Sequence, residues 1–182
     1  MGIEMGGAPG VNPAFNAPVV SNCTIINCAC GITLTYAANS TISNCTVTGS
    51  AWNGILMDYA TGGVISNCRL HDNGANVPNG CTAIGVQDST GLTVQNCVVY
   101  NEDNGGGYDG DGIDFEGNNS NCTVSGCFFY SCDGFGVVFN VTGGLNTGMQ
   151  VVNTMIYNNN LSMIGPNYYQ IYSPSNANQA SF

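Results

Sequence analysis

The acidic residues with the clearest potential for chemistry lie close together, in the stretch YDGDGIDFEG at 108–117. This stretch contains Asp109, Asp111, Asp114 and Glu116, out of only 11 acidic residues in the chain. Hydrolysis of a glycosidic bond uses one protonated and one ionised carboxyl group, and crowding of like charges raises the pKa of a carboxyl group. Asp111, Asp114 and Glu116 are therefore candidate catalytic residues for glycan cleavage.

The same stretch has two other interpretations. One is a calcium site, because Ca²⁺ takes several hard oxygen ligands, and Asp109, Asp111, Asp114 and Glu116 offer them from one segment. The spacing does not match an EF-hand loop, however, and one segment rarely completes a coordination shell. The other is a turn without chemistry, because Asp and Gly are ordinary turn residues. The sequence leaves all three interpretations open.

The charge composition limits the class of partner. The 182 residues include no Lys, one Arg (Arg69) and one His (His71), and the net charge is -10. Nucleic acids and anionic membrane surfaces are bound through Lys and Arg, so neither is an expected partner. Polar character comes instead from Asn, Ser, Thr and Gly, which suits hydrogen bonding to a polysaccharide or the surface of an inert fibre.

The expected location is outside the cell, as a secreted or cell-surface protein. No apolar run is long enough to cross a bilayer, so membrane insertion is not expected. The first residues, MGIEMGGAPG, lack the basic and apolar regions of a signal peptide. We therefore expect that an export signal has been removed or that the chain is a fragment of a longer protein.

Short segments recur along the chain and indicate an internal repeat. STISNCTV, GVISNCRL, LTVQNCVV and CTVSGCFF align, and CTIINCAC and QVVNTMIY extend the alignment, which places Ile25 with Ile42 and Val152 with Val124. A second set, GITLT, GILMD, AIGVQ, GIDFE and GVVFN, recurs in step with the first. Alternating apolar residues predict strands with one buried face. Three short strands per repeat, with no helical stretch, predict an all-β coil that stacks on the next one.

These segments, with the run DGDGIDFEGNNSNCTVSGCFFYSCDGFGVVF, resemble the single-stranded right-handed parallel β-helix of the pectate-lyase-like superfamily. The resemblance covers roughly 18–160. It implies a solenoid of about six coils, in one domain over 1–182, with 161–182 as a C-terminal extension or cap. The fold hosts lyases, hydrolases, epimerases, phage tailspikes and adhesins, so the resemblance implies architecture and leaves the activity open.

The resemblance carries over no complete catalytic set. Hydrolases of the polygalacturonase type share only DGID at 111–114, and the GHG and RIK motifs that accompany it there are absent. Lyases and epimerases of this fold that act on uronates use Arg, Lys, His or Tyr as base and cations against the sugar carboxylate, and Arg69 alone provides for this poorly. We therefore expect a glycoside hydrolase over a polysaccharide lyase. No cofactor is required, and Ca²⁺ is the alternative.

The cysteines and asparagines of the repeat predict two ladders. The thiol ladder is inward and free of disulfides, because stacked parallel strands rarely offer the required dihedral, and it comprises Cys28, Cys45, Cys68, Cys97 and Cys127. Outside it, a disulfide stays open among Cys23, Cys81, Cys122 and Cys132. The asparagine ladder is expected to hydrogen-bond from coil to coil through Asn27, Asn44, Asn67 and Asn96.

The repeat also places the acidic stretch. Alternation in GIDFE turns Ile113 and Phe115 inward and Asp114 and Glu116 outward, onto an exposed face. The two longest turns, 71–82 and 100–111, enter this same sheet and are expected to wall a cleft. The cleft brings two further catalytic candidates, Asp58 and His71, and four candidate substrate-binding residues, Tyr59, Gln87, Tyr108 and Asn140.

Two classes of function follow. The first is an extracellular or surface solenoid module that binds or cleaves polysaccharide in the acidic cleft around 109–116. The alternative is a structural or adhesin solenoid without enzymatic activity that stacks on itself end to end into a fibre, because an uncapped solenoid end exposes unpaired backbone groups.

Overall fold

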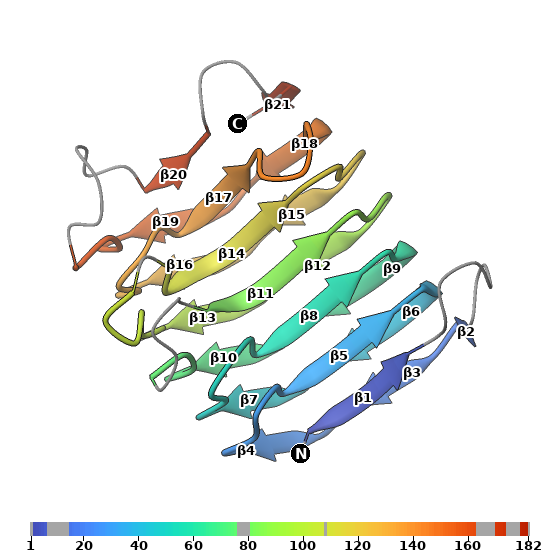
Figure 1. Cartoon of the computed structure of the whole chain (residues 1–182), viewed down its shortest axis with the longest axis horizontal. Coiled ribbons are helices and arrows are strands. Elements are labelled where there is room, and N and C mark those ends of the chain that lie inside the picture. Colours follow the sequence, from blue (N-terminus) through green and yellow to red (C-terminus); the bar gives the residue numbers. More distant parts are fainter. Residues whose placement is uncertain are drawn as a thin grey trace.

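The computed structural model describes residues 2–6, 15–75, 81–107, 109–162, 170–173 and 179–181. These residues form 21 strands and no helix. The strands are short because Gly, Asn and Ser interrupt the apolar alternation every few residues. The chain winds as a solenoid in which every strand pairs in parallel with its equivalents in neighbouring coils, and β1 and β21 lie at opposite ends (Figure 1).

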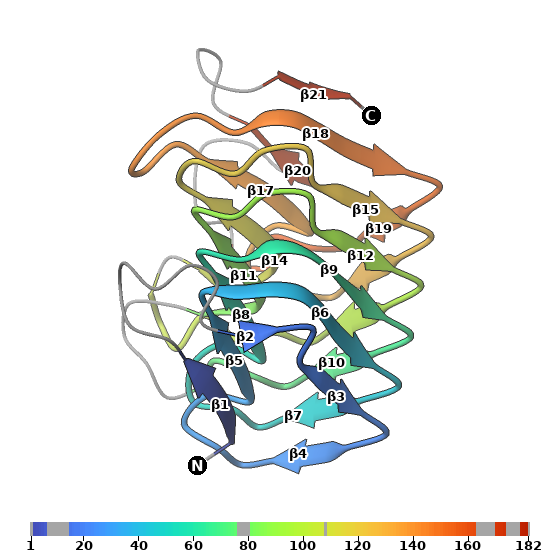
Figure 2. The same ribbon diagram turned by 90° about the vertical axis from the view of Figure 1, so that its right-hand side faces the viewer.

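Three parallel sheets form the faces of the solenoid (Figure 2). Sheet 1 contains, in spatial order, β1 (Ile3–Gly6), β5 (Ile32–Thr35), β8 (Ile55–Asp58), β11 (Thr82–Gln87), β14 (Asp111–Glu116), β17 (Val137–Asn140) and β20 (Ile171–Tyr172). Sheet 2 contains β19 (Met155–Tyr157), β16 (Phe128–Tyr130), β13 (Val98–Tyr100), β10 (Arg69–His71), β7 (Thr46–Thr48) and β4 (Thr24–Ile26). Sheet 3 contains β2 (Phe15–Asn16), β6 (Ala37–Ser43), β9 (Thr61–Ser66), β12 (Thr93–Gln95), β15 (Thr123–Ser125), β18 (Thr147–Val152) and β21 (Gln179–Ser181), with β3 (Val19–Ser21) also paired to β6.

The predicted all-β solenoid with three strands per coil is confirmed. Sheet 2 has six strands, so about five full turns separate β4 from β19, close to the predicted number of coils. Pairing is in register along most of the stack, so each strand position forms a column. In sheet 1, for example, Ile55, Ile84 and Ile113 are consecutive partners and are fully buried.

The core is a set of such inward columns, one or two from each sheet. Sheet 1 contributes large residues, among them Leu34, Met57, Phe115 and Phe139, all at most 1% exposed. Sheet 3 contributes Ile42, Ile65, Val94 and Val124, as the repeat predicts. Burying each such side chain contributes about 1.5–3 kcal/mol, so these columns are the main source of stability.

The alignment of the first repeat is wrong by one strand. Ile25 pairs with Val47 in sheet 2, and Val20 takes the position beside Ile42 in sheet 3. At the other end, Val124 pairs with Val151 and not with Val152. The error arises because SNCT at 21–24 and INCA at 26–29 read almost alike, so the local pattern cannot distinguish two frames five residues apart.

The thiol ladder exists, and its first member is Cys23. Cys23 precedes Thr24 as Cys45 precedes Thr46, so Cys23 stacks at the end of the column that continues through Cys68, Cys97 and Cys127. All ten cysteines are free. All five ladder thiols donate to the carbonyl oxygen two residues earlier, at 3.2–3.4 Å, which satisfies them without a disulfide.

The other cysteines lie in different columns. Cys28 follows Ile26 and lines up with Ser50, which removes it from the predicted ladder. Cys122 and Cys132, which the prediction left outside the ladder, are both buried within the apolar core. The sequence could not show this because a turn between two sheets of a solenoid also has an inward face.

The predicted asparagine column serves the backbone rather than a side-chain ladder. Asn44, Asn67 and Asn96 have φ values of 53°, the left-handed conformation that Asn tolerates, and their side chains are exposed. Coil-to-coil hydrogen bonds between buried asparagines occur at another corner, where Asn119 Nδ2 donates to Asn146 Oδ1 at 2.9 Å. The predicted ladder is therefore wrong in its members, and the coil-to-coil contact is made by asparagines outside the repeated motif.

Candidate functional site

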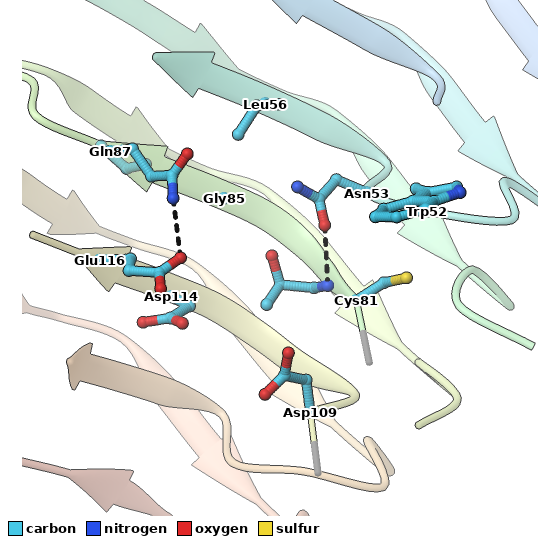
Figure 3. A pocket seen from close by; sticks show the side chains of 11 residues that line it. Trp52, Asn53, Leu56, Cys81, Gly85, Gln87, Asp109, Asp114 and Glu116 are labelled. Atoms are coloured by element: carbon cyan, nitrogen blue, oxygen red, sulfur yellow. Dashed lines mark hydrogen bonds between the residues drawn. The ribbon is translucent and has the colours of Figure 1, made fainter. Parts of the chain in front are cut away.

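A pocket of about 280 Å³ lies on the outward face of sheet 1, over β8, β11 and β14 (Figure 3). This is the sheet on which the sequence places the acidic stretch. Its lining is Trp52, Asn53, Leu56, Cys81, Thr82, Gly85, Val86, Gln87, Asp109, Asp114 and Glu116.

The floor of the pocket exists because one outward position has no side chain. Leu56, Gly85 and Asp114 are consecutive partners on β8, β11 and β14. A Cβ on Gly85 would lie 3.0 Å from Asn53 Nδ2 and 3.2 Å from Leu56 Cδ1, closer than side chains normally approach. Glycine therefore leaves a hollow between the two larger neighbours.

The ends of the two long turns wall the pocket, as predicted. Cys81 ends the first turn and Asp109 lies near the end of the second. Gly110 N donates to Cys81 O at 2.8 Å, which joins the turns beside the pocket. Asn53 Oδ1 accepts a hydrogen bond from Thr82 N at 3.1 Å and fixes the start of β11. The side chains that reach the pocket therefore come from three successive coils.

Asp114 is the most unusual group of the pocket. It points outward, as predicted, but it is only 7% exposed, so the expectation of a solvent-exposed carboxyl is wrong. Its Oδ1 atom is buried without a hydrogen-bond partner among the described residues. Burial, followed by the charges of Glu116 and Asp109, raises the pKa of Asp114 to about 8, although hydrogen bonds with Asn140 oppose the shift. Asp114 is consequently protonated at neutral pH.

Glu116 and Asp109 complete the carboxyl cluster. Glu116 Oε2 accepts a hydrogen bond from Gln87 Nε2 at 2.8 Å, between the neighbouring strands β14 and β11 (Figure 3). Asp109 is half-buried, and burial together with the charge of Glu116 raises its pKa. The pocket thus contains the carboxyl group of Asp114 in its acid form and, two residues along β14, the hydrogen-bonded carboxyl group of Glu116.

Comparison with protein families decides the family of the chain. A family model described as "Right handed beta helix region" matches residues 10–180. The chain belongs to this right-handed β-helix family. A search of curated proteins returned no match. Membership fixes the fold of this β-helix, and its pocket has to be interpreted from its own residues.

Asp111, a predicted catalytic and calcium-binding residue, does not line the pocket of the β-helix. Its Oδ1 accepts a hydrogen bond from Phe135 N in the next coil, and the side chain is 4% exposed. A Cβ on Gly134 would clash with this Oδ1, so Gly134 makes room for the contact. Burial and then the charge of Asp114 raise the pKa of Asp111 well above its usual value. Asp111 is a buried residue at the start of β14 that joins two coils.

His71 lies on another face of the β-helix, so its predicted place in the cleft is wrong. It ends β10 in sheet 2, where its ring stacks on Tyr100 with centroids 4.8 Å apart. Its Nδ1 is 2.6 Å from Asp72 Oδ2 and 3.3 Å from Thr48 Oγ1. The sequence predicted that His71 begins the long turn. In the structure His71 ends β10, and the turn from sheet 2 to sheet 1 begins only after it.

Of the remaining candidates in the described residues, only Gln87 lines the pocket. Asp58, Gln87, Glu116 and Asn140 are consecutive partners, as predicted, but only Gln87 and Glu116 reach the pocket. Burial and the charge of Asp88 raise the pKa of Asp58. Tyr59 stacks on Tyr36 at 4.8 Å, outside the pocket. Tyr108 lies outside the described residues.

Sequence reasoning missed Asn53, Cys81 and Gly85 as parts of this site. Gly85 carried a signal, because it is the single glycine in an outward column of otherwise larger residues, Thr33, Leu56, Asp114 and Val138. Asn53 and Cys81 lie in turns that do not repeat, and no pattern pointed to them. The site therefore depends on irregular positions of an otherwise regular β-helix.

The geometry does not assemble the predicted calcium ligands. Within the described part of the chain, no group of three or more His, Cys, Asp or Glu side chains is placed to hold a metal ion. Asp111 accepts a hydrogen bond from Phe135, so it does not join the other three predicted ligands around a common point. In the same described residues, no helix is long and apolar enough to cross a membrane.

Proposed function

We propose that this β-helix is a carbohydrate-active module that binds a polysaccharide in the sheet 1 pocket and hydrolyses it by acid catalysis. The observation that carries the proposal is Asp114. A carboxyl group that is buried, protonated at neutral pH and unpartnered on one oxygen is poised to donate a proton to whatever fills the pocket. No cofactor takes part.

The roles follow from the two environments. Asp114 donates its proton to the glycosidic oxygen, and the bond from that oxygen to the anomeric carbon breaks. The carboxylate of Glu116, oriented by Gln87, stabilises the positive charge that develops on the sugar ring. Water then adds its hydroxyl group to the anomeric carbon, and its remaining proton restores Asp114.

Amide variants test the proposal. Asp114→Asn and Glu116→Gln should each lower the rate of reducing-sugar release by about 100-fold or more, the factor typical of a lost acid or base. Asp58→Asn is the matched control, since Asp58 lies in the same outward row but outside the pocket. Equal activity of the Asp114 and Asp58 variants would overturn the assignment, and binding without cleavage by the parent would reduce the function to recognition.

The pH profile is a second test. The folded-state pKa of Asp114 is raised to about 8, so the acid form is present at lower pH and is lost as pH rises through that value. Activity should therefore fall on the alkaline side near pH 8.

Calcium binding is the competing interpretation of the carboxyl cluster. If Ca²⁺ binds there, added Ca²⁺ should raise the melting temperature of the parent but not of the Glu116→Gln variant.

We infer the place of action from the substrate class. Structural polysaccharides lie in cell walls and matrices, so the module is proposed to act as a secreted or surface-bound protein. Its buried thiols are shielded from oxidation there. A cell-fractionation experiment that found the full-length protein only in the cytoplasm would contradict this placement.

A second proposed function, end-to-end self-association, rests on the end strands of sheet 2. Among the described residues, nothing pairs with the outer edges of β4 and β19. Their sequences, TII and MIY, contain no charge or proline of the kind that usually protects an edge strand. Ile26 is 56% and Met155 is 60% exposed. Adding β4 of one copy to β19 of another would continue the parallel column and generate an open filament.

The polarity of this contact gives a sharp test. Ile26→Lys should block one end and Met155→Lys the other, so each variant alone should sediment as a monomer. Mixed together, they should form a dimer through their two intact ends. Leu145→Lys, at a position 55% exposed but away from both edges, is the control and should associate like the parent. A parent that stays monomeric at all concentrations would exclude self-association.

A further inference from the structure

Trp52 is the most exposed aromatic side chain among the described residues. It is 54% exposed, and no described aromatic ring stacks on it. Tyr59, the other strongly exposed aromatic residue near sheet 1, has one ring face covered by Tyr36 at an interplanar angle of 7°. A sugar ring needs an open aromatic face to pack its C–H groups against, and the indole of Trp52 provides one.

The indole lies at one end of the pocket, and the Gln87–Glu116 pair lies at the other (Figure 3). Asn53, next to Trp52, uses its oxygen to accept from Thr82 N, while its Nδ2 points over Gly85 into the hollow and donates to no described residue. The pocket therefore offers, in sequence, an apolar platform, an amide donor, the protonated Asp114 and a carboxylate acceptor. This series matches a sugar, with one apolar ring face and hydroxyl groups around its edge.

The charges of the pocket select among sugars. Asp109 and Glu116 line it beside the protonated Asp114, and no cationic side chain does. The whole chain has a single cationic side chain besides its one His, Arg69. Arg69 lies in sheet 2, where Nη1 donates to Tyr100 Oη at 3.3 Å. A sugar carboxylate would be placed beside like charges, with nothing to neutralise it, and like-charge juxtaposition opposes binding.

We propose that the pocket binds an uncharged sugar ring stacked on Trp52 and discriminates against uronic acids. This inference rests on the proposed carbohydrate function and narrows it to neutral glycans. The buried Asp114 Oδ1, which has no partner among the described residues, is the second feature that points to a ligand, because a hydroxyl group of the sugar would satisfy it.

The single tryptophan makes the test direct, because the chain contains no other. Titration with cello-, xylo- and manno-oligosaccharides should change the emission of Trp52 and saturate for at least one of them. Oligogalacturonates of matched length, in calcium-free buffer, should leave the emission unchanged. An oligogalacturonate whose affinity equals or exceeds that of each neutral oligosaccharide would overturn the proposal.

Variants read by calorimetry separate stacking from catalysis. Trp52→Ala should weaken binding of the responding neutral oligosaccharide about tenfold. Tyr59→Ala, which removes an exposed ring outside the pocket, should bind like the parent. If Trp52→Ala also binds like the parent, the platform assignment is wrong even where Asp114-dependent cleavage is observed. If the neutral oligosaccharide binds on Trp52 and is never cleaved, the hydrolase proposal fails and the neutral-sugar site stands.

Discussion

The outward faces of sheets 1 and 2 are built from the same parallel register but are used differently. On sheet 2, His71, Tyr100, Tyr130 and Tyr157 are consecutive partners, and their rings stack at 4.8, 5.0 and 5.5 Å. Each ring covers its neighbour, so the ladder stabilises the coil stack and leaves few open ring faces.

On sheet 1 the corresponding column changes residue type at every coil. Leu56, Gly85 and Asp114 differ in size and charge, and the glycine opens a hollow instead of continuing a stack. A regular column in a solenoid therefore favours stability, whereas a broken one creates a cavity. A site in this fold is therefore best sought where the repeat fails.

The largest expected effect tests the core that both faces share. Val94 is fully buried in sheet 3, so Val94→Asp leaves an unpaired carboxyl group in an apolar column. The penalty of several kcal/mol is comparable with a total stability of roughly 5–15 kcal/mol, and we expect the variant to be unfolded by circular dichroism. Gln95→Asp, on the outward side of the same strand, should remain folded, and a Val94→Asp protein with the parent melting curve would refute the inward assignment.

The next effect concerns the turn that leads from sheet 2 to sheet 1. Glu102 is 1% exposed there, with Oε1 accepting from Asn73 Nδ2 at 3.1 Å and Oε2 buried without a partner among the described residues. Burial raises the pKa of Glu102 to about 8. Because the folded-state pKa is above the unfolded value, the stability associated with the bound proton is present at low pH and is lost as pH rises from about 4.5 through about 8.

Glu102→Gln should remove this component of the pH dependence. Between pH 5 and pH 9, denaturant unfolding should show the parent losing a few kcal/mol more than the variant, a difference that reflects the linkage between proton binding and folding. Glu4→Gln, at an exposed position on β1, should follow the parent at every pH. Parallel curves for parent and Glu102→Gln would show that Glu102 is not protonated in the folded state.

The aromatic ladder should matter for stability alone. Tyr130 stacks between Tyr100 and Tyr157 and also makes a tilted contact with Phe128, so Tyr130→Ala removes three ring contacts worth about 0.5–1.5 kcal/mol each. The melting temperature should fall by several degrees, at about 2–4 °C per kcal/mol for a chain of this size. Glycan binding and cleavage should be unchanged, and a loss of activity in the folded variant would mean that the two faces are coupled.

The smallest expected effect on stability should follow from filling the hollow. The backbone of Gly85 is not in the left-handed region, so Gly85→Ala should keep the fold, while its methyl group presses on Asn53 and Leu56. We expect binding of the responding oligosaccharide to weaken about tenfold, with a change in unfolding free energy of about 1 kcal/mol or less. Gly6→Ala, at an open outward position of sheet 1, is the control and should bind normally.

Much of this structure could be predicted because a solenoid repeats. Alternation placed Ile113 and Phe115 inward and Asp114 and Glu116 outward, and the common register placed Gln87 beside Glu116. Where the repeat itself was ambiguous, the prediction failed. Cys23 and Cys28 exchanged places because two similar motifs follow each other within five residues.

The sequence by itself determined the coil, most of its columns and the direction in which most strand residues point, because these follow from a period of two within a strand and from the stacking of equivalent residues in successive coils. It did not determine burial on the outward face. Burial and the neighbouring Glu116 and Asp109 raise the pKa of Asp114, whereas Phe135 and Gly134 in the next coil position Asp111 outside the pocket. The turns do not repeat, so only the tertiary structure decided which carboxyl groups meet in the pocket and which of them holds a proton.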